Sequence, residues 1–90
     1  MQTATTASTN IGAFIRKARL EKGFSQKKLA SKIGLTSGQN ISNWESGGIQ
    51  PRLSYLKKVC KVLDIDPAKV ETVLVKQYAR EVAREMASYS

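Results

Sequence analysis

The segment LTSGQNISNWESG, residues 35–47, holds a cluster of side chains suited to binding a polar ligand. Its amides and hydroxyls can bond the edges of nucleic-acid bases, but they can equally cap a helix or face water. Ile41 and Trp44 are three residues apart, so a helix would turn both to one face. The side chains that would then mostly face outward are Ser37, Gln39, Asn40 and Asn43.

The rest of the chain offers little for catalysis. It has no histidine, which removes the commonest general base and the commonest zinc ligand. Its seven acids show no obvious catalytic spacing. The one cysteine, Cys60, cannot form an internal disulfide and lies in an apolar stretch, which favours core packing in a reducing compartment. We therefore expect no enzyme, no metal and no cofactor.

Composition and charge indicate a small globular domain with a polyanionic partner. The ninety residues are 41% hydrophobic and 24% charged, which suits one domain with a modest core. No apolar run reaches the roughly 18 residues of a membrane span, and the polar stretch 1–10 has the composition of a flexible tail. Residues 11–63 carry eleven lysines and arginines against two acids, whereas residues 64–90 carry four against five. Such a basic part suits a polyanion, although plain solubility also explains it.

Four short helices are predicted to position the polar segment. Apolar spacing indicates helices over residues 11–22 and 26–32, with Asn10 and Ser25 as caps. Gly23 and Gly34 end these two helices, and a third contains the polar segment. A fourth helix spans residues 52–63. Its inward positions are predicted to be Leu53, Leu56, Val59, Cys60 and Leu63.

A long fifth helix follows. Asp66-Pro67 is a strong helix start, and nothing breaks a helix over residues 67–88, a length of about 33 Å. Its predicted apolar stripe is Val70, Val73, Leu74, Tyr78, Val82, Met86 and Tyr89. No strand pattern appears, so the predicted fold is all-α with five helices.

The order of these features resembles the lambda-repressor-like, or Cro/XRE, DNA-binding proteins over about residues 11–66. Two short helices meet at a tight turn and the second exposes amides, as in a helix-turn-helix. The matching positions are Arg19, the run Gly23-Phe24-Ser25-Gln26, Leu29-Ala30, Gly34, Ile41-Ser42, Glu45, Gly47, Pro51 and Leu63. The resemblance implies that residues 11–66 bind double-stranded DNA.

The turn departs from the family pattern. The family usually has three residues between the positions of Thr36 and Ile41, and this chain has four. Either the turn is longer by one residue or the third helix starts one residue earlier. The preferred interpretation makes Ser37 the N-cap, with Gly38 letting the backbone approach closely.

Within this motif the polar residues acquire specific expected roles. Side-chain amides can bond adenine at two atoms, so Gln39, Asn40 and Asn43 are expected to read bases, with Ser37 on a base or a phosphate. The residues expected to contact phosphate are Gln26, Lys27, Arg16, Lys17 and Arg52. The resemblance also implies that Gln26 braces the recognition helix and that Arg19 and Glu45 form a partly buried ion pair. Trp44 is expected in the core.

The fifth helix exceeds what a minimal DNA-binding unit needs. We expect residues 67–90 to form a homodimer through Val73, Leu74, Tyr78, Val82 and Met86, although a monomer whose helix folds back remains an alternative. The predicted function is a cytoplasmic, nucleoid-associated transcriptional regulator, a dimeric repressor or autoregulator that reads a palindromic operator. The alternatives are an antitoxin-type module that binds a protein partner through this helix, and non-specific DNA coating. No membrane partner is expected.

Overall fold

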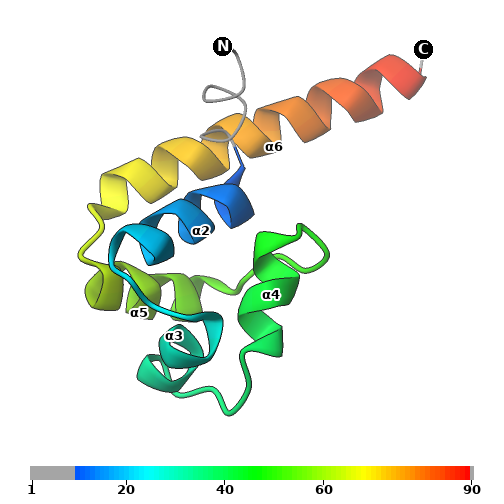
Figure 1. Cartoon of the computed structure of the whole chain (residues 1–90). Coiled ribbons are helices and arrows are strands. Elements are labelled where there is room, and N and C mark those ends of the chain that lie inside the picture. Colours follow the sequence, from blue (N-terminus) through cyan, green and yellow to red (C-terminus); the bar gives the residue numbers. More distant parts are fainter. Residues whose placement is uncertain (1–9, 90) are drawn as a thin grey trace.

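The computed structural model describes residues 10–89, and the regular structure in this range is entirely helical (Figure 1). Five helices follow one another and no strand occurs among these residues, which confirms the predicted all-α fold. The helices are α2 (Ile11–Glu21), α3 (Gln26–Lys32), α4 (Gln39–Glu45), α5 (Leu53–Leu63) and α6 (Pro67–Tyr89). Of the tail predicted over residues 1–10, only Asn10 lies within the described residues.

Local signals set the first helix ends as predicted. The Asn10 side chain accepts a hydrogen bond from the Ala13 amide at 3.2 Å, and Ser25 Oγ accepts one from the Lys28 amide at 3.0 Å. Both contacts satisfy amides that the first turn of a helix leaves without a partner. After α3, Gly34 takes φ +87°, a conformation that side chains with a Cβ rarely adopt, so the chain can turn sharply toward α4.

All five helices contribute to one hydrophobic core. Leu29, Ala30 and Ile41 have no exposed surface, and they belong to the core that holds α3 and α4 together. Trp44 is 4% exposed and packs against Tyr55 with 5.8 Å between ring centroids, which confirms its predicted place in the core. Burial of this order stabilises each large apolar side chain by about 1.5–3 kcal/mol.

Leu53 departs from its predicted inward position. It is the first residue of α5 and is 70% exposed, whereas Leu56, one turn later, is buried. The apolar face of α5 therefore meets the core one turn after the helix begins. The apolar spacing identifies the inward face of α5, but it extends that buried face one turn too far toward the start of the helix.

The predicted apolar stripe of α6 divides into two faces. Val70 and Val73 are buried and Leu74 is half-buried, so these three pack on the core of their own chain. Val73 therefore cannot belong to the predicted dimer face. Tyr78 and every residue from there to Ser88 are exposed, and the C-terminal half of α6 extends beyond the other helices in Figure 1.

Candidate nucleic-acid interface

The turn between α3 and α4 is tight because of a close backbone contact. A Cβ at Gly38 would lie 3.0 Å from the Lys27 amide nitrogen and 3.2 Å from the Lys27 Cα. Contacts that short would force the two segments apart, so glycine lets the start of α4 pack on the start of α3. The close approach expected of Gly38 is thus made to its own chain.

The additional residue of the turn lies ahead of α4. The N-cap residue of α4 is Gly38 rather than the predicted Ser37. Gly38 has no side chain that could cap the helix. Gly38 already has right-handed helical dihedral angles, and Ser37 Oγ accepts a hydrogen bond from the Gln39 amide at 3.0 Å. Ser37 thereby makes the bond of a capping residue one position early, and Gln39 becomes the first residue of α4.

The two faces of α4 differ as the sequence pattern predicted. Ile41 and Trp44 bury one face in the core, while Gln39 and Asn40 are exposed and Asn43 is half-buried. Gln39 Nε2 donates a hydrogen bond to Asn43 Oδ1 at 3.1 Å. The structure therefore brings two of the predicted base-reading amides together on one exposed surface.

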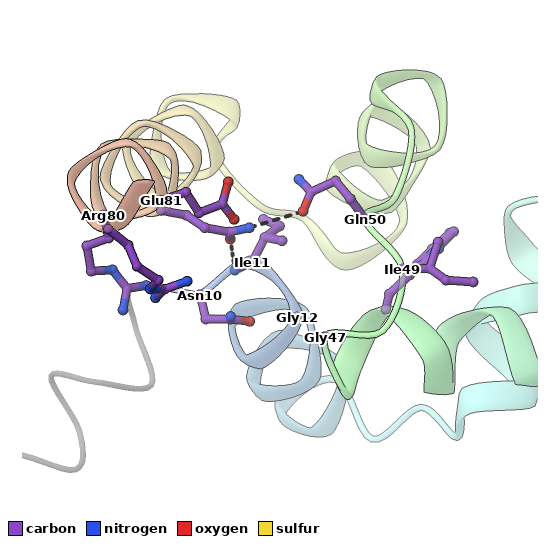
Figure 2. Close-up of a pocket in the computed structure, with 11 residues that line it drawn as sticks. Asn10, Ile11, Gly12, Gly47, Ile49, Gln50, Arg80 and Glu81 are labelled. Carbon is purple, nitrogen blue, oxygen red and sulfur yellow. Dashed lines mark hydrogen bonds between the residues drawn. The ribbon is translucent and has the colours of Figure 1, made fainter. Parts of the chain in front are cut away.

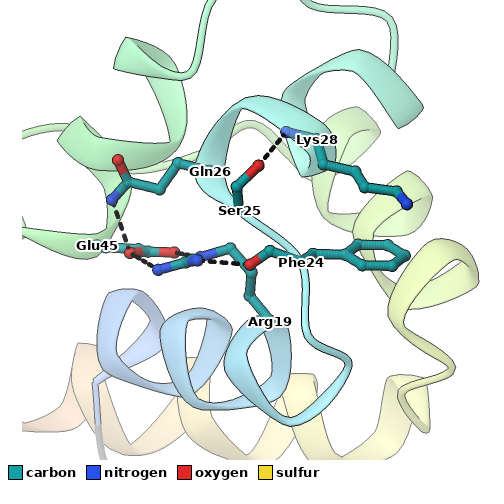
Figure 3. Close-up of polar contacts among 6 residues, drawn as sticks. All are labelled: Arg19, Phe24, Ser25, Gln26, Lys28 and Glu45. Atoms are coloured by element: carbon teal, nitrogen blue, oxygen red, sulfur yellow. Dashed lines mark hydrogen bonds and ion pairs between the residues drawn. The ribbon is translucent and has the colours of Figure 1, made fainter.

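A buried polar network holds the far end of α4 (Figure 3). Arg19 Nε lies 2.7 Å from Glu45 Oε2, and Arg19 Nη2 donates to Glu45 Oε1 at 3.1 Å. Arg19 Nη1 donates to the Phe24 carbonyl oxygen at 2.7 Å. The Arg19 and Glu45 side chains are only 7% and 4% exposed. The structure thus forms the ion pair that the family resemblance implied.

Gln26 completes this network from the first turn of α3. Its Nε2 donates a hydrogen bond to Glu45 Oε1 at 3.1 Å, so α2, α3 and α4 meet at one carboxylate. This contact is the brace that the resemblance implied for Gln26. No buried side-chain nitrogen or oxygen among the described residues lacks a hydrogen-bond partner, so the network is fully satisfied.

The remaining cations occupy different settings. Lys27, Arg16 and Arg52 are exposed, as a phosphate contact requires. Lys17 lines a hollow near the turn between α5 and α6, to which neither α3 nor α4 contributes. The acids of that hollow are Glu21, Asp64 and Asp66. Lys22 and Lys69 line the hollow as well and balance these acids, so the phosphate role of Lys17 stays a prediction.

Sequence reasoning missed a junction that joins α6 to the start of α2 and to the segment between α4 and α5 (Figure 2). The Ile11 amide donates to Gln77 Oε1 at 2.9 Å, and Gln77 Nε2 donates to Gln50 Oε1 at 3.1 Å. Nearby, a Cβ at Gly12 would overlap the Trp44 carbonyl oxygen, so α2 packs against α4 backbone to backbone. The available signal was Gln77 itself, a polar residue four positions after Val73 and therefore on the same side of a helix.

The described residues offer no site of another kind. Among them, no group of three or more histidine, cysteine, aspartate or glutamate side chains is arranged to hold a metal ion. Burial raises the pKa of the Cys60 thiol, and the Asp66 carboxylate raises it further, so this thiol is a poor nucleophile. None of the helices in this range combines the length and hydrophobicity of a membrane span.

Comparison with known proteins places this geometry in a family context. The family model described as helix-turn-helix matches residues 15–70. A multi-protein-binding factor 1 of Yarrowia lipolytica is 43% identical over 56 residues, which cover 62% of this chain and 36% of that protein. An HTH-type transcriptional regulator of Archaeoglobus fulgidus is 40% identical over 70 residues, which cover 77% of this chain and 30% of that protein. The chain thus spans about a third of the length of these relatives. No solved structure matches it with comparable significance.

Proposed function

This chain belongs to the helix-turn-helix family of the Cro/C1 type, and we propose that it binds double-stranded DNA sequence-specifically and regulates transcription. The observation that carries the proposal is α4, whose outer face presents amides while its inner face is buried. A helix fixed in this way can present its side chains to bases without first being ordered. The name of the relative from Archaeoglobus fulgidus agrees with this function.

Base recognition is assigned to the exposed face of α4. An α-helix with its side chains is about 10–12 Å across, so α4 can enter the major groove, which is about 12 Å wide. The hydrogen bond between Gln39 and Asn43 holds the two amides next to each other, and Gln39 Oε1 and Asn43 Nδ2 would serve as acceptor and donor for a base edge. Asn40 and Ser37 extend the same surface toward the start of the helix.

Phosphate contacts would fix the register of α4 in the groove. Gln26 and Lys27 stand at the start of α3, where backbone amides carry partial positive charge. Arg16 and Arg52 are further exposed cations suited to the DNA backbone. The basic composition of residues 11–63 supports this assignment, because each phosphate contact releases counterions and adds to affinity.

The finer proposal is a dimeric repressor or autoregulator that acts on DNA in the cytoplasm. Residues 11–66 would form the DNA-binding unit and residues 67–90 the dimerisation element. Two copies related by a two-fold axis would place their α4 helices in successive major grooves, about 34 Å apart, on a palindromic operator. The exposed apolar side chains of α6 support a dimer, because surface of that kind is buried in stable oligomers.

A second candidate function is binding of another protein through α6, as in an antitoxin-type module. The same exposed side chains of Tyr78, Val82 and Met86 favour it. The relative from Yarrowia lipolytica is named for binding several proteins, which is consistent with such a role.

Selection of bound duplexes from a randomised pool, at near-physiological salt, tests the primary proposal. Specific binding predicts one enriched motif, and a dimer predicts two inverted half-sites about 10–11 base pairs apart. Chains with Gln39→Ala and Asn43→Ala provide the control, since they should lose the motif while remaining folded. Binding without any enriched motif would indicate non-specific coating, and no binding would favour the protein-binding function.

A further inference from the structure

The distal half of α6 carries an apolar stripe that no described residue covers. Val75, Tyr78, Val82 and Met86 are 62%, 69%, 38% and 60% exposed. Their spacing of three, four and four residues places them along one side of the helix. The side that packs on the body carries Val70, Val73 and Gln77, so the stripe is a separate face of α6.

The stripe continues into an apolar groove between α5 and α6. The groove has a volume of about 850 Å³, and Val75 belongs both to its lining and to the stripe. Leu74 and the exposed Leu53 line it as well, and the α5 wall also carries Lys57 and Lys61. The groove and the stripe therefore form one surface that extends from α5 to the end of α6.

Helix stability argues that this surface is covered in the working protein. All eleven residues of the stretch 78–88 are exposed. This stretch continues α6 without tertiary packing, whereas most helical stability in proteins comes from the packing of an apolar face. An extended helix with an apolar stripe gains that packing from a second helix.

We propose that the partner is the same surface of a second copy, with the two α6 helices antiparallel about a two-fold axis near residue 80. This pairing places Tyr78 opposite the partner's Val82. It also places Val75 opposite the partner's Met86. The two-fold symmetry repeats both pairs with the two copies exchanged. In each pair a β-branched side chain meets a longer one, so the stripe is complementary to itself.

Charge supports the antiparallel direction. Glu85 follows Leu74 by eleven residues, about three helical turns, and so lies on the same edge of α6 as the groove. When the two-fold axis is perpendicular to the plane of the two antiparallel helices, the same edge of each helix lies on the same side of that plane. The partner's Glu85 therefore approaches the α5 wall, where Lys57 offers an opposite charge. The inference rests on the dimer of the proposed function and specifies the surface and direction of its contact.

Pairwise cross-linking of full-length chains tests the register. Val75→Cys and Met86→Cys chains, mixed and oxidised, should give a disulfide-linked dimer containing one chain of each kind. Each chain oxidised alone should remain uncross-linked. The unmodified chain controls for the buried Cys60, and Lys76→Cys mixed with Met86→Cys controls for random collision on another side of the helix.

Every outcome decides the inference. A cross-link within Val75→Cys alone would indicate parallel helices and overturn it, as would no cross-link in the mixture above that of the Lys76→Cys control. In sedimentation, Leu53→Ser should raise the dimer dissociation constant at least tenfold, whereas Leu20→Ser, at another exposed leucine, should leave it unchanged. Equal effects of the two changes on the dissociation constant would contradict the part that the groove plays in the dimer contact.

A charge exchange adds an independent test. Glu85→Lys should weaken the dimer several-fold, and Lys57→Glu in the same chain should restore it. If Lys57→Glu fails to restore dimerisation, the proposed contact between Glu85 and the partner's α5 wall is wrong. The selection of bound duplexes distinguishes failure of the proposed α6 contact from failure of the proposed DNA recognition. A palindromic motif without the cross-link refutes only this dimer contact, whereas the cross-link without any motif refutes only DNA reading.

Discussion

The outer face of α4 and the distal face of α6 are both exposed, but they differ in chemistry and in support. The α4 face is polar, and beneath it Ile41 and Trp44 fix the helix in the core. The distal α6 face is apolar, and Gln77, which precedes most of it, ties α6 to the body through hydrogen bonds with Ile11 and Gln50. One surface is fixed before any ligand arrives, whereas the other, in the dimer that we propose, gains its packing from a partner.

This contrast separates two tasks within ninety residues. Rigid support suits a surface that must match a hydrogen-bonding pattern, because misplaced amides would lose their partners. Apolar exposure suits association, since burial of such area is the main driving force between proteins. Changes beneath α4 should therefore alter folding, changes on its outer face should alter DNA recognition, and changes on distal α6 should alter association.

The largest effect should come from the ion pair that supports α4. Glu45→Ala leaves Arg19 buried without its carboxylate and removes the acceptor of Gln26, so the free energy of unfolding should fall by about 3–5 kcal/mol. Urea denaturation measures it. The double change Arg19→Leu and Glu45→Leu should cost less, because no charge is stranded. An unchanged unfolding midpoint for Glu45→Ala would show that the pair contributes no support.

A smaller loss of stability should follow Gly12→Ala. The added methyl group would overlap the Trp44 carbonyl oxygen and push α2 away from α4, at a cost of about 1–3 kcal/mol. Gly48→Ala is the matched control, because its nearest neighbours lie at 3.7 Å and its substitution should be tolerated. Thermal unfolding of both variants compares them directly, and equal melting temperatures would refute the close contact.

Changes on the outer face of α4 should affect binding without affecting folding. Gln39→Ala removes an exposed amide and should weaken binding to the selected duplex by about 1–3 kcal/mol. Fluorescence anisotropy with the selected and an unrelated duplex checks this. Affinity for the unrelated duplex should stay the same, because phosphate contacts remain. A uniform loss on both duplexes would assign Gln39 to the backbone instead.

The smallest effect should come from the junction of α6. Gln77→Ala removes two hydrogen bonds, each worth about 0.5–1.5 kcal/mol, and should loosen α6 where it leaves the body. Hydrogen exchange of the Ile11 amide should then accelerate. Lys76→Ala, the neighbouring exposed position, should not change that rate. Equal protection in both variants would mean that the junction does not attach α6.

The sequence predicted most of what depends on near neighbours. The caps at Asn10 and Ser25 and the turn at Gly34 follow from side-chain reach and backbone freedom, which short segments determine. The buried face of α4 followed from the spacing of Ile41 and Trp44. These features agree with the structure because tertiary packing reinforces the local preferences.

The remaining features depend on contacts between distant segments. The predicted α6 stripe held Val73, Tyr78 and Val82 together, and it could not show that Val73 packs on its own core while the other two are exposed, because all three are apolar. Leu53 fitted the α5 pattern, yet that helix meets the core one turn later. The place of Lys17 in a hollow of mixed charge depends on how α2 packs near the turn that follows α5. Such outcomes are set by the relative placement of helices, which periodicity does not specify.

Backbone NMR of the full chain, recorded first on dilution and then on addition of the selected duplex, tests the central distinction most directly. The account predicts that DNA shifts the amides of α4 and the start of α3 while residues 78–88 stay unchanged. Dilution should shift the amides near Val75, Tyr78, Val82 and Met86 while α4 stays unchanged. Shifts caused by DNA that centre on distal α6 and spare α4 would contradict the assignment of the two surfaces.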